Sequence, residues 1–274
     1  MKKFTEAQIS TAILDAYHEK FRCALQSDVV IVGAGASGLT AAWKLASGGM
    51  RVVVLEKRLS PGGGIWGGSM GMNEIVVQPE ALDIVNAVGV RHRTHGSLFV
   101  IDALELAAAL CLKAVQAGAT VLNLINAEDV CLHNGRVTGL VANRSLIGES
   151  LPVDPIVFTA QAVIDATGHE AVVANFLARR GYLKKGVLVD SGEDAMDAQA
   201  GEAFVVDHVR EIFPGLWVTG MAVCATQGGP RMGPIFGGML LSGAKAAKLV
   251  SEVLGKQSSG GQHSADQVKT RGNK

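Results

Sequence analysis

The sequence predicts an α/β fold built on a parallel sheet, and two patterns carry this prediction. Residues 29–33 form a continuous apolar run that ends in glycine, which is typical of a strand buried on both faces of a parallel sheet, and residues 162–168 predict another buried strand ending in glycine. Residues 37–49 have the pattern of a helix ending in glycines, and a second strand follows at 51–57. Residues 28–57 therefore predict a βαβ unit.

The other elements are predicted in chain order from their periodicity. Residues 5–24 carry apolar residues at helical spacing and predict an opening helix that packs on another element. Residues 60–71 are rich in glycine and follow neither period, so we expect a loop that lines a site. Asn134-Gly135 predicts a hairpin turn between strands in 120–143, and hence an inserted β-sheet. The remaining predictions are helices at 80–89, 102–117 and 170–180, a loop or short strand at 144–160, a last core strand at 215–221, a glycine-rich turn at 228–238 and a closing helix at 238–254.

The composition is that of one globular domain. The chain has 274 residues, of which 48% are hydrophobic and 18% are charged, so it can bury a large core. We expect one domain over residues 1–254 and a disordered polar tail over 255–274, where no apolar period is present. The 25 basic and 25 acidic residues give a formal charge of zero, which argues against a nucleic-acid or membrane-surface partner.

The sequence also gives expectations for location and cysteine chemistry. No stretch predicts a membrane span, and the charged N-terminal segment lacks the apolar centre of a signal peptide, so a cytoplasmic protein is expected. Cys23, Cys111, Cys131 and Cys224 are widely separated and include no CxxC pair. This spacing disfavours a zinc site and a disulfide framework, and we expect reduced, mostly buried thiols.

A dinucleotide-binding motif lies in the βαβ unit. Gly33, Gly35 and Gly38 form the pattern GxGxxG between the buried strand and the helix, and Glu56 ends the second strand 18 residues after Gly38. The glycines allow the backbone to approach a pyrophosphate, the helix N-terminus supplies N–H donors, and Glu56 accepts hydrogen bonds from ribose hydroxyls. The motif predicts a Rossmann-like dinucleotide-binding fold; a glycine turn that serves only helix packing is the alternative interpretation.

These residues define the dinucleotide only in part. The acid Glu56 favours an unphosphorylated ribose, hence NAD or FAD over NADP, although Lys57 follows it directly. In many flavoproteins of this architecture the last strand ends in Gly-Asp, whereas this chain has Gly220-Met221. The missing carboxylate weakens the flavin interpretation, and both NAD and FAD stay open at this point.

Five segments carry motifs that go beyond GxGxxG. They are VVIVGAGASGLTAA at 29–42, PGGGIWGGSMGMN at 61–73, VDP at 153–155, IDATGHE at 164–170 and PRMGPIFGGMLLSG at 230–243. Together they resemble the thiamine thiazole synthase family, and the likeness runs from about residue 5 to residue 254. The resemblance implies a flavoprotein-type, glutathione reductase-like variant of the Rossmann fold and an assembly of eight subunits.

The resemblance also implies a reaction. In this family NAD is a substrate: its nicotinamide is lost, and the freed ADP-ribose is opened to a ketose, condensed with glycine and given sulfur. The product is ADP-5-ethyl-4-methylthiazole-2-carboxylate, the thiazole precursor of thiamine. Yeast-type and plant-type members take the sulfur from their own cysteine, two residues before the Asp that matches Asp154, where this chain has Pro152. Because proline has no sulfur, the resemblance implies the archaeal and bacterial type, a transferase that uses free sulfide and Fe(II) over many turnovers.

Individual residues receive roles from the resemblance. Asp154 and His169 match the catalytic iron ligands, with Asp154 coming from a neighbouring subunit. Carboxylate oxygen and imidazole with open positions suit Fe(II). Arg231 matches the residue that holds the carboxylate of glycine. The implied dinucleotide contacts are Gly33, Gly35, Ser37, Gly38, Glu56, Lys57, Gly64, Ala127, Pro152, Val153, Asp154 and Met221.

Other interpretations remain beside this one. From the residues alone, Asp154 would be a turn residue, His169 would pack at a strand end, and Arg231 would form an ion pair with Glu74 or Asp165. A FAD-dependent oxidoreductase would share the fold and the motif. An activity of the ribose-1,5-bisphosphate isomerase type is chemically related to the opening of ADP-ribose, and a non-catalytic module would bind the dinucleotide and leave it intact.

Overall fold

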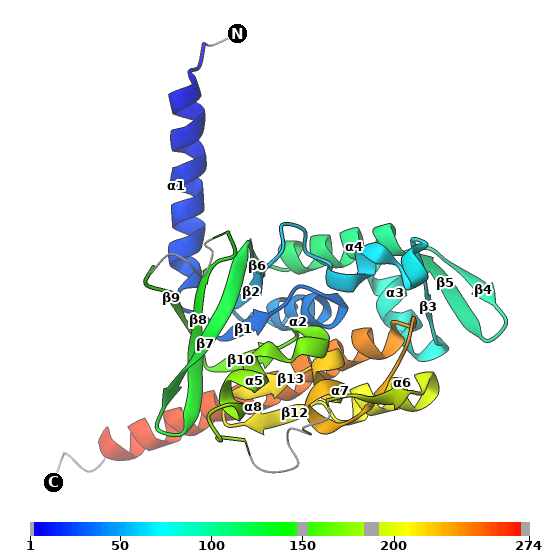
Figure 1. Ribbon diagram of the computed structural model, residues 1–274. Helices are drawn as coiled ribbons and strands as arrows, with labels where there is room; N and C mark the ends of the chain where they lie inside the picture. Colours follow the sequence, from blue (N-terminus) through cyan, green and yellow to red (C-terminus); the bar gives the residue numbers. More distant parts are fainter. Residues whose placement is uncertain (1–2, 147–152, 184–191, 270–274) are drawn as a thin grey trace.

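A six-stranded sheet forms the centre of the molecule. The structure is a computed structural model, and it describes residues 3–146, 153–183 and 192–269. The strand order is β12-β13-β10-β1-β2-β6, and all neighbours are parallel except β12 and β13 (Figure 1). The strands are β1 (Val29–Val32), β2 (Val52–Glu56), β6 (Thr120–Asn123), β10 (Ala162–Asp165), β12 (Arg210–Phe213) and β13 (Leu216–Val218).

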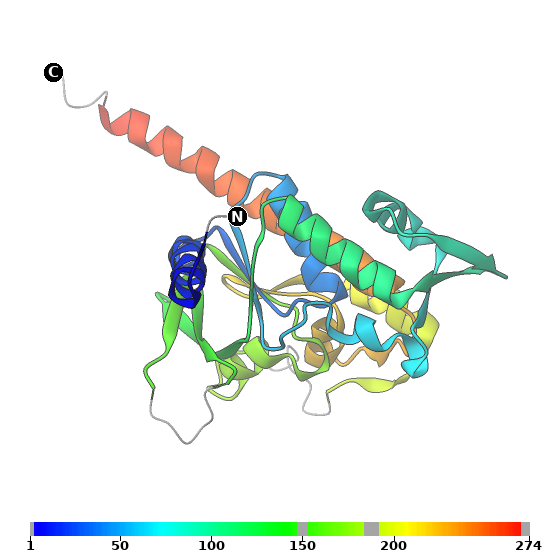
Figure 2. The ribbon, with the colours of Figure 1, turned by 90° about the horizontal axis from the view of Figure 1, so that it is seen from above.

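Different layers cover the two faces of this sheet. Three helices pack on one face, and an antiparallel sheet together with a short helix packs on the other (Figure 2). This arrangement confirms the predicted α/β fold with an inserted sheet. The helices on the first face are α2 (Ala36–Ser47), α4 (Ala103–Gln116) and α8 (Gly237–Lys269), and the second face carries β7 (Ile125–His133), β8 (Arg136–Arg144), β9 (Ile156–Thr159) and α5 (Val172–Ala178).

Strand β1 shows why both faces must be covered. All four of its residues are buried. Val29 and Ile31 pack among the helices, whereas Val30 and Val32 pack against the second sheet, because successive side chains of a strand point to opposite faces. The continuous apolar run therefore has the structural meaning that the sequence predicted.

The inserted sheet differs from the prediction in its membership. The hairpin turn at Asn134-Gly135 joins β7 and β8, as expected, and β9 pairs with β8. β6, which the sequence grouped with this hairpin, instead pairs parallel with β2 at the edge of the main sheet. The turn brings together only the two strands that flank it, β7 and β8. It does not determine the partner of β6, which pairs with the main sheet.

Sequence analysis missed several elements. Strand β4 is exposed throughout and β5 is only partly buried, so neither shows the continuous apolar run that identified β1. Helix α7 begins at Met221, where the sequence predicted the end of a strand. The missed helices and strands are the sheet β3-β5-β4 (Glu74–Val77, Leu98–Asp102, His92–His95), α6 (Ala198–Asp207), α7 (Met221–Gln227), β12 of the main sheet and the strand pair β11 (Asp194–Met196) and β14 (Pro230–Arg231). Helix α3 (Leu82–Val88) was predicted.

The N-terminal helix α1 (Glu6–Ala24) projects from the body of the molecule (Figure 1). Thr5 starts it with a capping box: its hydroxyl accepts from the Gln8 backbone N–H, and the Gln8 side chain accepts from the Thr5 N–H. The expectation that this helix packs on another element holds only for its last two turns. There the guanidinium of Arg144 lies 5.4 Å from the ring of Tyr17, and the ring of Phe21 lies 5.6 Å from that of Phe158. Its apolar residues Ile9, Ile13 and Leu14 remain exposed.

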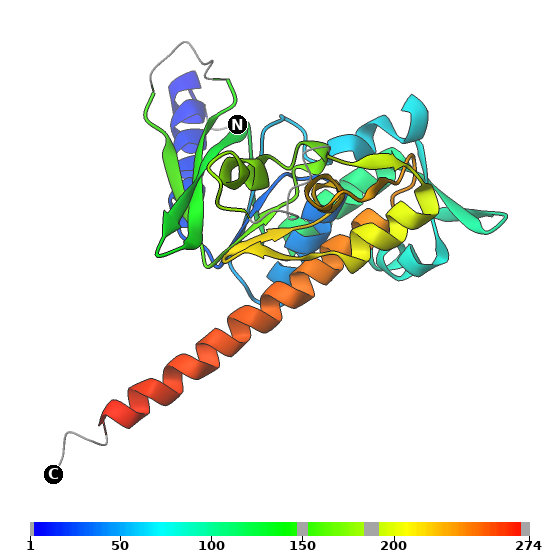
Figure 3. The same ribbon diagram turned by 60° about the horizontal axis from the view of Figure 1, so that its bottom comes forward.

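The C-terminal helix is longer than predicted. The sequence placed its end at residue 254 and a disordered tail at 255–274, but α8 continues to Lys269 (Figure 3). Residues 255–269 contain no proline, so every backbone N–H can continue the helical pattern. Across the described residues, every helix is too short or too polar to cross a membrane.

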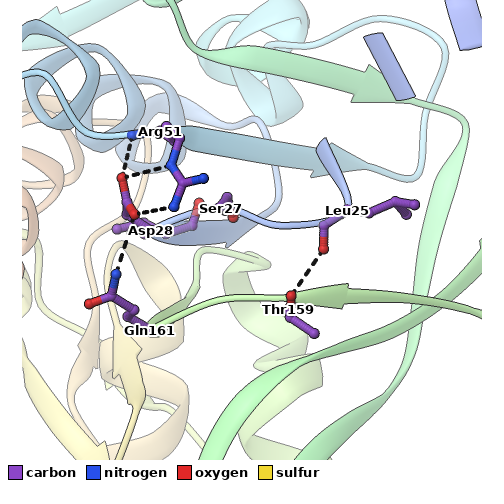
Figure 4. A network of polar contacts seen from close by, with 7 residues as sticks. Leu25, Ser27, Asp28, Arg51, Thr159 and Gln161 are labelled. Carbon is purple, nitrogen blue, oxygen red and sulfur yellow. Dashed lines mark hydrogen bonds and ion pairs between the residues drawn. The ribbon is translucent and has the colours of Figure 1, made fainter. Parts of the chain in front are cut away.

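A polar clasp ties together the amino ends of three neighbouring strands (Figure 4). The carboxylate of Asp28, directly before β1, accepts from the backbone N–H and the guanidinium of Arg51, both at 2.8 Å. It also accepts from the side-chain amide of Gln161, directly before β10, at 3.3 Å. Hydrogen bonds from Arg51 hold the pKa of Asp28 below its usual value. The clasp therefore lies at the amino ends of these strands, and their carboxyl ends are at the opposite end of the sheet.

Candidate functional site

A cavity of about 640 Å³ opens at the carboxyl ends of β1, β2 and β10. From β1 the chain continues to β2 on one side, whereas β10 pairs with β1 on the other side. β1 is therefore the strand at which the order reverses, the place where open α/β sheets bind ligands. The volume is in the range of pockets for small molecules and cofactors.

The glycine turn after β1 builds one wall of the cavity. Gly33 has φ of +99°, and a Cβ on it would lie 2.5 Å from the carbonyl oxygen of Ala166, so this position requires glycine. A Cβ on Gly35 would meet no atom within 4 Å, so its open side is available to a ligand. Gly38 does not line the cavity; a Cβ there would overlap the carbonyl oxygen of Gly33. The predicted ligand role of Gly38 is thus replaced by close packing of the helix on the strand.

The first turn of α2 points its N–H groups toward the cavity side. Gly35 is the N-cap and supplies no side-chain cap, and Ala36 and Ser37 line the cavity. Such an N-terminus attracts anions, because its N–H groups lack helical partners and the helix dipole is positive there. Two glycines allow close packing against this turn, because a Cβ at Gly220 or Gly243 would overlap Ser37.

Glu56 stands where the sequence placed it, at the end of β2 and in the cavity wall. It is 5% exposed, and its two carboxylate oxygens accept from the backbone N–H groups of Ala34 and Arg58, each at 2.8 Å. A carboxylate has about four acceptor sites, so each oxygen can still accept from a ribose hydroxyl.

The carboxylate of Glu193 joins two of the predicted site residues. It lies 2.7 and 2.8 Å from Nδ1 of His169 and 3.6 Å from Nε of Arg231. The Glu193 side chain is only 11% exposed. Since a carboxylate accepts, Nδ1 of His169 is the donor in this contact, and in the neutral ring Nε2 then carries the lone pair. Sequence analysis missed Glu193, which belongs to no motif.

The alternative ion-pair partners predicted for Arg231 are wrong. Glu74 instead accepts from Arg93 at 3.0 Å. Asp165 is fully buried, and its carboxylate accepts from the backbone N–H and hydroxyl of Thr167 and from the N–H of Ala174. Burial raises the pKa of Asp165. These bonds fix the loop that carries His169 to the end of β10.

The structure does not bring Asp154 to His169 within one chain. Asp154 and Val153 are exposed, and neither lines the cavity. Pro152 lies outside the described residues. Among the residues that are described, no group of three or more His, Cys, Asp and Glu side chains could hold a metal ion. Of the two residues predicted as iron ligands, only His169 lines the cavity of a single chain.

The four cysteines lie away from the cavity wall, and all are in the described part of the chain. Cys224 is buried, and burial raises the pKa of its thiol to about 12. Burial likewise raises the pKa values of Cys111 and Cys131, and Cys23 is exposed on α1. No described thiol thus lies where it could react with a ligand in this cavity.

The rest of the lining combines predicted and unexpected residues. Gly64 and Ala127 line the cavity as predicted, and a Cβ on Gly64 would meet no atom within 4 Å. Asn126, beside Ala127, was missed. Five methionines, whose flexible thioethers adapt to irregular ligand shapes, were recognised only at position 221; they are Met70, Met196, Met221, Met232 and Met239.

Comparison with known proteins gives a consistent result over almost the whole chain. The profile of the Thi4 family matches residues 10–236. The thiamine thiazole synthase of Thermococcus kodakarensis is 49% identical over 253 residues, covering 92% of this chain and 99% of that protein. That of Thermotoga maritima is 50% identical, covering 90% and 97%. The crystal structure of Thermovibrio ammonificans THI4 superposes with a TM-score of 0.88 at 45% identity, covering 93% of this chain and all of that one.

Proposed function

The chain belongs to the Thi4 family and acts in thiamine biosynthesis as a thiazole synthase, and we propose that it converts NAD, glycine and free sulfide into the adenylated thiazole carboxylate with Fe(II). The observation that carries the proposal is that His169, Arg231 and Glu56 line one cavity. These side chains are suited to bind a metal, a carboxylate and a ribose, respectively, and the shared cavity supports a single ligand site for all three.

NAD is the proposed dinucleotide substrate. The N–H groups at the start of α2 bind the pyrophosphate, and Glu56 accepts from the ribose hydroxyls. Gly35, Gly64 and Gly168 fit this ligand, because a Cβ on any of them would meet no protein atom within 4 Å and would project into free space. The backbone can therefore approach the dinucleotide closely at three places.

Fe(II) fits the metal ligand that one chain supplies, the imidazole of His169. Metal-binding histidines usually donate their second ring N–H to a carboxylate, which is the arrangement of His169 and Glu193. When bound, Fe(II) would hold sulfide and orient it toward the carbon that it attacks. Asp154, the second proposed ligand, is exposed and away from its own cavity, so it reaches His169 of a neighbouring copy.

The assembly that this requires is a homo-oligomer, and we propose an octamer. Helix α1 stands away from the body and exposes Ile9, Ile13 and Leu14 on the surface. Burial of these exposed apolar side chains against another subunit would be favourable. In this proposal the catalytic site is complete only in the oligomer, because each site needs Asp154 of a neighbouring subunit.

Glycine and sulfur enter from solution. Arg231, 55% exposed at the side chain, presents its guanidinium to the carboxylate of glycine, whose amine condenses with the opened sugar. Because no cysteine lines the cavity and Pro152 stands at the donor position, the sulfur comes from sulfide. The protein therefore keeps its thiols and turns over repeatedly.

The test is an anaerobic incubation of the purified protein with Fe(II), NAD, glycine and sulfide, followed by mass spectrometry of products and protein. Several molecules of nicotinamide and adenylated thiazole per chain, with no change in protein mass, are expected. Product formation without sulfide, accompanied by loss of sulfur from the protein, would contradict the sulfide-dependent mechanism. Intact NAD and a flavin spectrum would instead support the oxidoreductase alternative.

A further inference from the structure

Two cations follow directly after the acid that is proposed to bind the ribose. Lys57 and Arg58 come after Glu56 at the end of β2, and all three residues line the cavity. In dinucleotide folds a cation near this acid accommodates a 2′-phosphate on the adenosine ribose. The β2 end considered alone would thus be suited to NADP as well as to NAD.

Glu170 changes the charge at the end of β2, although it follows β10, which lies on the opposite side of β1. Its carboxylate follows β10 and accepts from Nζ of Lys57 at 2.8 Å, although the two residues are 113 positions apart in sequence. The contact with Lys57, and then the charge of Arg58, hold the pKa of Glu170 below its usual value. Glu170 also lines the cavity, so the pair lies at the ligand site itself.

We propose that Glu170 is a specificity-determining residue that excludes dinucleotides carrying a 2′-phosphate, because it occupies Lys57 and neutralises its charge. This inference rests on the proposed binding of NAD. With Glu170 present, the two acids Glu56 and Glu170 balance the two cations Lys57 and Arg58. Without it, the ribose site has one excess positive charge, and Lys57 is released to donate to a phosphate oxygen.

Binding of two matched probes tests the proposal. Isothermal titration at low salt compares ADP-ribose with 2′-phospho-ADP-ribose on wild type, on Glu170→Gln, and on Glu170→Gln combined with Lys57→Met. The control is Glu105→Gln, which removes the same charge from an exposed ion pair with Arg91 outside the cavity. Thermal unfolding of each variant checks that it is folded.

The readout is the ratio of the two dissociation constants. We expect wild type and Glu105→Gln to prefer ADP-ribose equally, and Glu170→Gln to shift the ratio toward the 2′-phosphate about fivefold, as suits an exposed ion pair. The double variant should return toward the wild-type ratio. An unchanged ratio in folded Glu170→Gln overturns this inference and leaves the proposed function standing. Failure of wild type to bind ADP-ribose overturns both.

Discussion

Nδ1 of His169 lies 2.7 Å from Oε1 of Glu193, and this contact determines which ring nitrogen is available to a ligand. The carboxylate accepts from Nδ1, so in the neutral ring Nε2 is the electron-pair donor. The same carboxylate lies 3.6 Å from Nε of Arg231. One buried acid therefore orients both the proposed iron ligand and the proposed glycine-binding residue.

Replacing Glu193 should weaken metal binding. Because Glu193→Gln removes the charge that supports the His169 imidazole, we expect Fe(II) affinity to fall by at least about tenfold. Anaerobic titration of the purified oligomer with Fe(II) measures this. Glu193→Asp should recover part of the affinity, and Glu252→Gln on the exposed surface of α8, outside the cavity, is the matched control. Equal affinity in wild type and Glu193→Gln would refute the orienting role.

Two inactive variants should complement each other. Asp154→Ala and His169→Ala should each abolish thiazole formation while leaving the fold and NAD binding largely intact. If Asp154 acts on a neighbouring subunit, oligomers that contain both variants hold some sites with neither substitution. Co-expression followed by the nicotinamide-release assay should then restore measurable activity. A mixed preparation as inactive as either parent would place both ligands in the same chain.

The acidic clasp at the start of β1 should make stability depend on pH. Asp28→Asn removes the carboxylate that Arg51 and Gln161 share, so we expect a loss of about 1 kcal/mol at pH 7. The pKa of Asp28 is lowered in the folded state, so its contribution is full above about pH 4 and disappears as the pH falls through the folded value. Urea unfolding at several pH values should show the two proteins converging in acid.

Two glycines of α8 should respond oppositely to alanine. A Cβ at Gly243 would overlap the backbone carbonyl of Ser37, so Gly243→Ala should cost about 1–3 kcal/mol by forcing α8 away from α2. A Cβ at Gly255 would meet nothing within 4 Å, so Gly255→Ala should stabilise the helix by about 0.5–1 kcal/mol. Urea unfolding of both variants measures the difference. Similar effects at the two positions would show that the packing of α8 on α2 is not limiting.

Local patterns were sufficient to predict the βαβ unit, the glycine turn and Glu56. Each of these depends on residues that are neighbours in sequence or separated by one helix. The pairing of Lys57 with Glu170 joins residues 113 positions apart, and Glu193 contacts His169 from 24 positions away without belonging to any motif. Such contacts arise only when β10 takes its place beside β1. The exposed strand β4 was missed because it lacks an apolar face.

Gly35, Gly64 and Gly168 give the cavity a surface made of main chain on the side proposed to bind the dinucleotide. Main-chain amides cannot be exchanged by mutation, so their hydrogen bonding to a ligand persists through any change of side chain. Any substitution of these three glycines adds side-chain atoms and therefore narrows the cavity. A redesign for a bulkier or different dinucleotide would therefore have to work at the rim, where Met70 and Met196 are 76% and 61% exposed and can be shortened.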